Sequence, residues 1–517
     1  MTEYVFGANI LENLTTGMYK DSKVIYREYI QNSCDQIDKA LKEGILKPNE
    51  GTIKIWLDRD KRTISIEDDA TGIAAASFQR TLGNIADSDK KVGEDKGFRG
   101  IGRLCGLAYC KELVFRSSAK GENTVSIMVC DAKKMRSLID ENQRGKKHSA
   151  NEMLHAINRF EQEMTDDLDS HFFRVELIDI NQENTDLLDF QQVKDYLSFV
   201  APVPYQNIFT YRSEVYKKAK ELGFRLDEYN IALEGEQIFK KYITILKEPT
   251  GTKYDDIFDI DFKNFYDADG ELLAWMWFGL SKFQKAIPKI NQMRGLRLRK
   301  ENIQIGGEDS LQKLFKEDRG NSYFVGEVFA LNKDLIPNSQ RDYFNENKAR
   351  AEFEQELRKY FNEELHKIYY DGSAFNSAYK KIDTYQKKEA EFKEKDATSG
   401  FVDKDHRKRD LKIVAESKKE AETAQVRIEK MKEKADNPMH KVITRIEHDR
   451  PKPVIRVVLP VSTDEPKEIK STHRTDRLSQ YSRPERKLIS KIFSIILTET
   501  DSETAERIIS KVEEGLQ

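Results

Sequence analysis

An amphipathic helix followed by two short strands constrains the fold of this chain more than any other feature. Apolar residues recur at helical spacing from Ile25 to Leu41, and Gly44 and Pro48 then end the pattern. Residues 52–57 and 62–66 each alternate between polar and apolar side chains, with a charged turn between them. Since each element is apolar on one face, the elements must pack against one another, and an α+β sandwich is predicted for the N-terminal region.

A chain of 517 residues is longer than one hydrophobic core usually supports, so several domains are expected. In the N-terminal part, further strands are predicted at 113–117, 124–129 and 172–178, and a helix at 190–199. A second predicted domain contains strands at 240–246, 272–278, 295–299 and 323–330, followed by a helix from Glu346 onward. The N-terminal part is therefore predicted to have a mixed or antiparallel sheet with helices on one side.

The C-terminal third has a different composition. Lys, Glu, Ala and Asp dominate residues 387–435, which indicates one or two long exposed helices or a coiled coil, broken near Ser399-Gly400. Prolines then mark a linker around a strand-like run at 454–459, and a last helix from Pro484 carries an apolar stripe. This stripe is predicted to dock, to mediate dimerisation or to pack back on its own chain. The predicted domains are 1–204, 205–361, a charged helical region 362–436, a linker 437–483 and a terminal helix 484–517.

Composition narrows the functional classes. The formal net charge is −3, which gives no global attraction to nucleic acid. The four cysteines lack metal-ligand spacing, and no apolar run reaches the length of about 18 residues that a membrane helix needs. The N-terminus lacks a secretion signal, so a cytoplasmic protein with reduced thiols and no membrane contact is expected.

The first helix carries the most chemical information. Glu28, Asn32 and Asp35 are four and three residues apart, so they share one helix face. A carboxylate takes a proton from an attacking water, and an amide oxygen is a hard ligand suited to Mg²⁺. The alternative is a solvated polar stripe without function.

Two later segments favour a functional role for these three residues over a solvated stripe. The second strand runs into Asp68-Asp-Ala-Thr-Gly72, where a carboxylate can accept a hydrogen bond from an exocyclic amine such as that of adenine and the glycine lets backbone approach closely. Residues 93–106 hold five glycines before an apolar run, a pattern typical of an anion-binding loop, and the polar stretch 81–95 before it has the character of a closing lid. The loop is neither a Walker loop nor a Rossmann site, since it lacks a Gly-Lys-Ser/Thr ending and does not follow the first strand of a βαβ unit.

The order of these three motifs resembles the GHKL (Bergerat-fold) ATPases, which include the ninety-kilodalton heat-shock chaperones, the mismatch-repair MutL proteins, type II topoisomerases and MORC proteins. The resemblance covers about residues 20–110. It implies a Bergerat-type α/β sandwich followed by a transducer-like α/β middle domain, with ATP and Mg²⁺ as cofactors. Sensor histidine kinases of the same group place their nucleotide domain after a phosphoacceptor helix, which does not fit the order here.

The resemblance also implies roles for single residues. Glu28 would be the general base, Asn32 would coordinate Mg²⁺, and Asp35 would support the nucleotide end of the helix. Asp68 would hold the adenine amine, with Gly72 beside it; Asp69 is the rival but fits the register of the family motif less well. The residues implied to contact the phosphates are Gly97, Arg99, Gly100, Ile101 and Gly102.

This chain departs from the family pattern at two places. Ala70 replaces the first glycine of the adenine motif, which is tolerable at a negative φ. The family's later Gly-Thr pair falls where Ser170-His171 stands, and Ser170 is the residue there that offers a hydroxyl. The resemblance therefore supports an adenine contact at Ser170 less than it supports one at Asp68.

In the predicted domain 205–361, residues 334–342 (Asp-Leu-Ile-Pro-Asn-Ser-Gln-Arg-Asp) resemble the catalytic loop of the chaperone middle domain. Arg341 would then reach the γ-phosphate, because a guanidinium is always charged and matches phosphate oxygens in geometry. A surface ion pair is the alternative for Arg341, and Lys333 is a less well placed substitute, given the lysine that topoisomerases and MutL use.

These features predict an ATPase switch that closes or dimerises with nucleotide, most simply as a homodimer. Its partner is either DNA or an effector protein, and a role in bacterial DNA repair or antiviral defence rests on family analogy. The cationic segment 282–300 is a candidate contact for phosphate backbones, although such runs are commonly solvated. The alternatives are a protein-remodelling chaperone and a scaffold whose nucleotide site only regulates assembly.

Overall fold

The computed structural model describes residues 21–85, 102–398, 400–450 and 502–516, together with shorter pieces at 7, 12–13, 15, 96, 100, 481–482, 485, 488–489, 492–493, 496–497 and 500. The chain forms two compact units. The first consists of Met1–Ser281 and Lys285–His366, and the second of Lys282–Gln284 and Lys367–Gln517. Each is described by itself below.

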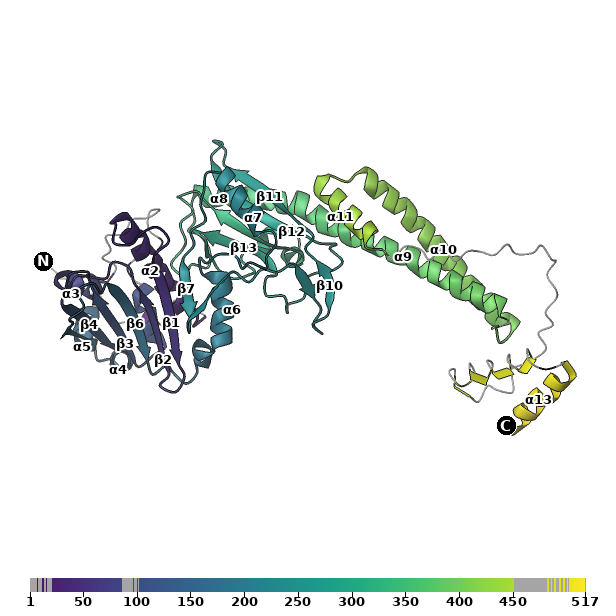
Figure 1. Ribbon diagram of the computed structural model, residues 1–517, viewed down its shortest axis with the longest axis horizontal. Coiled ribbons are helices and arrows are strands. Elements are labelled where there is room, and N and C mark those ends of the chain that lie inside the picture. Colours follow the sequence, from purple (N-terminus) through teal and green to yellow (C-terminus); the bar gives the residue numbers. More distant parts are fainter. Residues whose placement is uncertain are drawn as a thin grey trace. The chain divides into compact units, whose positions relative to one another are not determined.

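The N-terminal part of the first unit is built on an eight-stranded sheet (Figure 1). Its neighbouring strands pair antiparallel except β1 and β7, which run parallel, so the sheet is mixed. In spatial order the strands are β5 (Asn158–Met164), β4 (Thr124–Asp131), β3 (Glu112–Ser118), β6 (Phe172–Ile178), β2 (Thr63–Asp68), β1 (Thr52–Asp58), β7 (Asn230–Leu233) and β8 (Glu236–Gln237). The last two come from residues beyond 204, so the chain returns to this sheet after leaving it.

Helices cover one face of this sheet because alternate strand residues are apolar. Ile53 and Ile55 of β1 and Ile64 and Ile66 of β2 point into one core, which the apolar faces of the helices complete. The helical elements are α2 (Val24–Lys42), α3 (Ala75–Gly83), η1 (Gly102–Ala108), α4 (Ala132–Gln143), α5 (Ala150–Ile157), η2 (Thr185–Leu188) and α6 (Phe190–Val200). The α+β sandwich predicted from the sequence is confirmed.

The middle part of the first unit has a second sheet with the strand order β11-β12-β15-β13-β14. Its elements are α7 (Arg212–Glu221), β9 (Ile245–Lys247), β10 (Lys253–Asp256), β11 (Asp259–Tyr266), β12 (Leu272–Leu280), β13 (Gly295–Lys300), β14 (Ile303–Gln304), η3 (Gln312–Leu314), η4 (Asp318–Tyr323), β15 (Val325–Ala330) and α8 (Lys348–Tyr360). Of the strand predicted at 240–246, only β9 forms as a strand. The reason is that Lys240 pairs with the backbone at Pro204 and Gln206 instead of extending a sheet.

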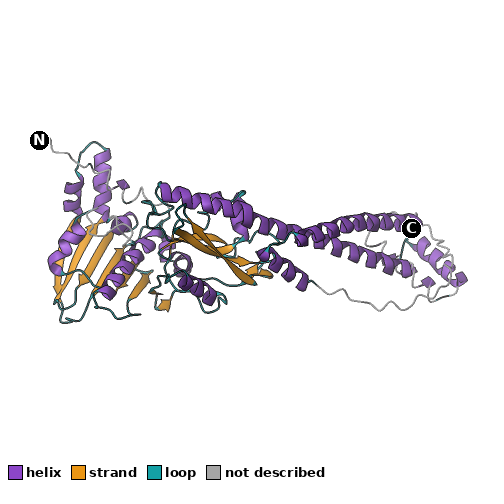
Figure 2. Cartoon of the chain, turned by 90° about the horizontal axis from the view of Figure 1, so that it is seen from above, coloured by secondary structure: helices purple, strands orange, loops and turns teal. Residues whose placement is uncertain are grey.

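The second unit is helical over most of the residues that are described. After a π-helical turn (Phe361–Leu365), α9 (His366–Ala397) and α10 (Lys404–Glu433) lie side by side (Figure 2). Lys388 bonds to Ser417 at 2.9 Å and Lys395 to Asp410 at 2.6 Å, so the two helices are antiparallel. The predicted break near Ser399-Gly400 lies between them.

The region after α10 differs in part from the expected linker. Residues 437–448 form a helix, α11 (Asn437–His448), because Asp436 caps its start and a proline is tolerated in the first turn. The strand-like run at 454–459 lies outside the described residues. Near the C-terminus, Phe493 packs against Ile509 of α13 (Ser502–Gly515), so the terminal apolar stripe contacts its own chain.

Among the helices within the described residues, none combines the length and the apolar character that a membrane crossing requires.

Candidate functional site

Helix α2 places the three predicted polar residues on the face opposite the core. Tyr29, Ile30 and Cys34 point into the sheet, whereas Glu28 and Asp35 are buried beneath loops rather than beneath the sheet. Asn32, between them, is half-buried. Because Glu28 and Asp35 are only 8% and 6% exposed, the polar face is not a solvated stripe.

The Glu28 carboxylate is enclosed by two arginines and a glycine. Arg27 donates from Nε and Nη2 to Glu28 Oε1 at 3.3 and 3.2 Å. Arg341 Nε lies 3.9 Å from the same oxygen. On the other side, a Cβ added to Gly102 would lie 2.6 Å from Glu28 Oε2, so the glycine leaves room for the carboxylate.

Arg341 reaches Glu28 from the middle part of the unit. Its loop is closed by a bridge between Pro337 and Phe344, and its carbonyl accepts the Gly306 N–H at 2.8 Å. Arg341 has φ +53°, a left-handed conformation that is uncommon for a residue with a side chain and is found at functional sites. Arg27 also donates to the Gln340 carbonyl at 3.1 Å, which holds the loop against α2. Lys333, the weighed substitute, is exposed.

Asp35 holds backbone of the glycine-rich segment. Its Oδ1 accepts the Lys96 N–H at 2.8 Å, while the Lys96 carbonyl accepts hydrogen bonds from Gln31 Nε2 and Arg341 Nη2. Of the predicted phosphate-contacting residues, Gly100 has φ +68°, which favours glycine, and Gly102 begins η1. The others, Gly97, Arg99 and Ile101, lie outside the described residues.

Asp68 is the buried carboxylate at the end of β2. It is 1% exposed, and its Oδ2 has no hydrogen-bond partner among the described atoms, while Oδ1 accepts the Ala70 N–H at 3.2 Å. Burial raises the pKa of Asp68 to about 7, against hydrogen bonds from Ser33 and Ala70 that lower it. Asp69, the rival, instead accepts the Thr52 N–H at 2.6 Å and so ties β2 to β1.

The turn after Asp68 is tightly packed. Gly72 has φ +65°, and a Cβ there would lie 1.9 Å from the Ser118 carbonyl, so only glycine fits. Ala70 is not among the residues with positive φ, as its side chain requires. The ring of His171 contacts the Ala70 carbonyl at 2.5 Å. Ser170 lines a surface cleft together with Asp69.

The residues present fit ATP and Mg²⁺ in kind. An unpartnered, buried carboxylate oxygen such as Asp68 Oδ2 matches the need of an adenine amine for an acceptor. Among the described residues, no three His, Cys, Asp or Glu side chains converge into a metal site. Mg²⁺ usually binds one or two protein ligands plus phosphates, and Asn32 offers an amide oxygen on the same helix face as Glu28.

Most cations of the segment 282–300 are either paired with a carboxylate or buried. Lys282 pairs with Asp449 at 3.0 Å, Lys285 with Glu248 at 2.5 Å and Arg294 with Glu308 at 2.9 Å. The remaining members on β13, Arg297, Arg299 and Lys300, are buried. Lys289 is exposed, so the segment keeps part of its charge for a phosphate backbone.

Sequence reasoning missed several residues that the structure brings to the site. Adjacent residues on a helix normally point in different directions, so no sequence pattern indicated that the Arg27 side chain contacts Glu28. Lys96 and Asp227 meet at 3.5 Å although they are far apart in the chain. A lysine within the glycine-rich segment was the one available signal for this contact.

Comparison with known proteins supports the motif reading. Residues 20–163 match the family described as histidine kinase-, DNA gyrase B-, and HSP90-like ATPase. The chain is 36% identical over 130 residues to Chaperone protein HtpG of Coxiella burnetii (strain RSA 331 / Henzerling II), covering 22% of this chain and 20% of the relative. Identity to the HtpG of Acinetobacter baylyi is 27% over 132 residues, covering 22% and 21%. For the HtpG of Chromobacterium violaceum it is 33% over 88 residues, covering 16% and 14%.

The match is confined to the N-terminal segment. The chain spans about a fifth or less of the length of these curated relatives. Residues 20–163 thus match a family of GHKL-type ATPases, as the order of motifs predicted. The middle and helical regions have no counterpart within these matched stretches.

Proposed function

We propose that the GHKL-type domain at residues 20–163 binds and hydrolyses ATP with Mg²⁺, and that Arg341 of the middle region completes the catalytic site. The observation that carries this proposal is the position of the Arg341 guanidinium, 3.9 Å from the Glu28 carboxylate across two separate parts of the fold. A buried ion pair adds little net stability, because the cost of removing both charges from water offsets their attraction. An arginine that a separate loop places beside the proposed base is therefore better explained by a role in a reaction.

The roles follow from the local contacts. Glu28 would accept the proton of the attacking water, and Arg27 and Gly102 would fix the direction of its carboxylate. Arg341 would stabilise negative charge that develops on the transferred phosphoryl group. Mg²⁺, held through Asn32 and the phosphates, supplies charge neutralisation when bound.

Recognition of adenine would rest on Asp68. Its unpartnered Oδ2 would accept the adenine amine, and Gly72 would keep the turn close to β3. Asp35 would act indirectly, through the Lys96 backbone that it holds. Gly97, Arg99, Gly100 and Ile101 remain the proposed phosphate-contacting backbone together with Gly102.

ATP turnover by the full-length protein and its Glu28→Ala variant tests this proposal. Glu28→Ala should bind a fluorescent ATP analogue with wild-type affinity and lose at least about a hundredfold in kcat, the range expected for a general base. Glu43→Ala, which removes an exposed carboxylate from just beyond the same helix, is the control and should keep wild-type turnover. Normal turnover by Glu28→Ala would refute the assignment of the base.

Closure with nucleotide is proposed to involve a homodimer. Sedimentation of Glu28→Ala with and without ATP tests this, because a variant that binds but does not hydrolyse should accumulate the closed form. A mass that stays unchanged at saturating ATP would argue against dimerisation driven by nucleotide.

What the switch acts on is proposed in two forms. A partner-protein or DNA-related process, including bacterial repair or defence, predicts salt-sensitive binding of duplex DNA or of an effector that changes with an ATP analogue. A remodelling chaperone is favoured by the name of the matched relatives and by the arginine loop, and it predicts suppression of client aggregation that Glu28→Ala abolishes. Because most cations of the 282–300 segment are paired or buried, that segment by itself gives the DNA form little support.

A further inference from the structure

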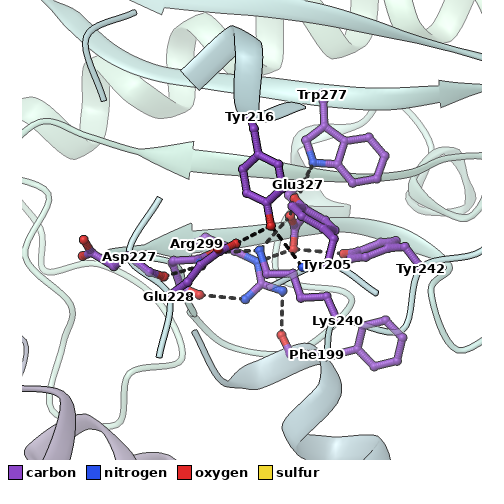
Figure 3. A network of polar contacts seen from close by, with 11 residues as sticks. Phe199, Tyr205, Tyr216, Asp227, Glu228, Lys240, Tyr242, Trp277, Arg299 and Glu327 are labelled. Atoms are coloured by element: carbon purple, nitrogen blue, oxygen red, sulfur yellow. Dashed lines mark hydrogen bonds and ion pairs between the residues drawn. The ribbon is translucent and has the colours of Figure 1, made fainter. Parts of the chain in front are cut away.

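A cluster of buried charges lies where the chain passes from the N-terminal sheet to the middle sheet (Figure 3). Glu327 lies on β15 and Arg299 on β13, both strands of the middle sheet, whereas Lys240 follows β8 of the N-terminal sheet. All three side chains are fully buried, and the Lys240 ammonium lies 3.2 Å from Glu327 Oε2. This ion pair therefore joins the middle sheet to the segment that returns from the N-terminal sheet.

The Glu327 carboxylate has other partners besides the lysine. Its Oε1 accepts hydrogen bonds from Arg299 Nε and, at 3.1 Å, from the Tyr242 hydroxyl, while its Oε2 accepts one from the Tyr205 hydroxyl. If Lys240 left the cluster, Glu327 would keep an arginine and two hydroxyl donors, so it would not become an unpaired buried charge. Separation of Lys240 from Glu327 therefore costs less than separation of an isolated buried ion pair.

The cluster also accommodates a neutral lysine. Two cations share one fully buried carboxylate, so the three charges do not balance. Burial and Arg299 lower the pKa of Lys240 to about 7, although Glu327 opposes them. A neutral amine keeps two N–H donors, so the hydrogen bond from Lys240 to Asn302 Oδ1, 2.6 Å long, survives the loss of the proton.

Lys240 is the member of the cluster whose charge changes just above neutral pH. Burial would raise the pKa of Glu327, but Arg299 and Lys240 lower it to about 2, so the carboxylate stays ionised. Burial raises the pKa of the neighbouring tyrosine hydroxyls above their usual value, so they keep their protons. Burial also raises the pKa of Glu228, which is the further candidate among the described residues. The charged and titratable groups around Lys240 are Glu327 on β15, Arg299 on β13, Glu228 before β7, Tyr216 on α7, Tyr205 and Tyr242.

We propose that Lys240 and Glu327 form a proton-dependent latch between the N-terminal and middle parts of the first unit. A lysine in water has a pKa near 10.5, whereas buried Lys240 has a pKa of about 7, so opening of the latch takes up a proton between these values. The latch therefore opens more easily as the pH falls from 8.5 to 7, and it tightens as the pH rises. It does not depend on the proposed ATP hydrolysis and gives the protein a response to pH in addition.

Amide hydrogen exchange of the full-length protein measures how often the latch opens. The Lys240 N–H bonds to the Pro204 carbonyl at 2.8 Å, and the Gln206 N–H bonds to the Lys240 carbonyl at 3.3 Å, so both amides exchange when this segment separates. After correction for the intrinsic exchange rate, protection of residues 204–208 and 238–242 should rise about tenfold from pH 7 to 8.5, as the two pKa values require. Protection that stays constant over this range would refute the latch.

Substitutions at position 240 remove the titration. Lys240→Arg carries its charge at every pH of the experiment and Lys240→Met carries none, so protection in each should stay constant within about twofold. Lys240→Arg alone is used if Lys240→Met does not fold, and a tenfold rise in Lys240→Arg would overturn the proposal. Lys241→Met, which removes an exposed ion pair with Asp195 from the next residue, is the matched control and should keep the rise. Glu228→Gln should keep it too; constant protection in Glu228→Gln would assign the proton to Glu228 instead of Lys240.

Exchange in a distant part of the N-terminal sheet separates a local latch from global unfolding. Protection of the paired strands β3 and β4 should change less than about threefold from pH 7 to 8.5, because the latch opens without unfolding that core. An equal rise in β3 and β4 would mean that the whole fold responds to pH, and it would overturn the latch. Since no nucleotide is present, a wild-type protein that fails to hydrolyse ATP would contradict the proposed function and leave these expectations unchanged.

Discussion

Asp68→Asn should make this protein more stable at neutral pH while removing its capacity to bind ATP. The structure buries the Asp68 carboxyl and raises its pKa to about 7, compared with 3.8 for an exposed aspartate. Between about pH 4 and 7 the folded protein keeps a proton that the unfolded chain has released, so the free energy of unfolding decreases as the pH rises through this window. An asparagine has no such proton and escapes the penalty.

The size of the effect follows from the shift. At about 1.4 kcal/mol for each pKa unit, the penalty at pH 8 is at most roughly 4 kcal/mol, a large part of the stability of a typical domain. Urea unfolding at pH 5, 6, 7 and 8 measures it. The three tryptophans, Trp56, Trp275 and Trp277, all lie in the first unit, so their fluorescence reports on the relevant part of the chain.

Asp69→Asn is the matched control, since the two residues are adjacent and Asp69 bonds to backbone instead. It exchanges the charge-assisted bond from the Thr52 N–H, 2.6 Å long, for a neutral one to the amide oxygen, so it should be slightly less stable than wild type but keep most of the decrease in stability from pH 5 to 8. Asp68→Asn should flatten that decrease. If wild type and Asp68→Asn show the same pH dependence, the burial argument for Asp68 is wrong; if Asp68→Asn still binds ATP tightly, its assignment to adenine is wrong.

Two glycines give further predictions. Gly102→Ala would place a methyl group 2.6 Å from Glu28 Oε2. We expect kcat to fall at least roughly tenfold, with little change in the free energy of unfolding. Steady-state turnover and urea unfolding measure the two effects, and an unchanged kcat would contradict the close packing. Gly72→Ala combines φ +65° with a Cβ 1.9 Å from the Ser118 carbonyl, so stability should fall by about 1–3 kcal/mol or more, and nucleotide binding should weaken; wild-type stability would mean that the turn relaxes easily.

Local patterns accounted for much of the fold. The helix predicted from Ile25 and the strands predicted at 52–57 and 172–178 form nearly as expected, because their periodicity reflects burial on one face. The edge strand β5 was not predicted, since most of its residues are exposed and show no alternation. The return of β7 to pair with β1 was not predictable either, because a pairing so distant in sequence leaves no local pattern.

The candidate site divides along the same line. Glu28, Asn32 and Asp68 were identifiable because their motifs are continuous in sequence. The contacts of Arg27, Lys96 and Asp227 depend on how loops meet, and their residue types alone are typical of any exposed ion pair. Family resemblance supplied Arg341, whose burial against Glu28 no spacing rule predicts.

The proposed general base, Glu28, and Arg341 extend from parts of the fold with different hydrophobic cores. This determines whether activity or folded structure is lost first. Glu28 stands on the helix that packs into the N-terminal core, and Arg341 extends from the part built around Trp275 and Trp277. A slight separation of the two cores would break the contact while each core stayed folded. Heat or denaturant should therefore abolish the proposed ATP turnover before the protein unfolds, and turnover lost in this way should return when the two cores come together again.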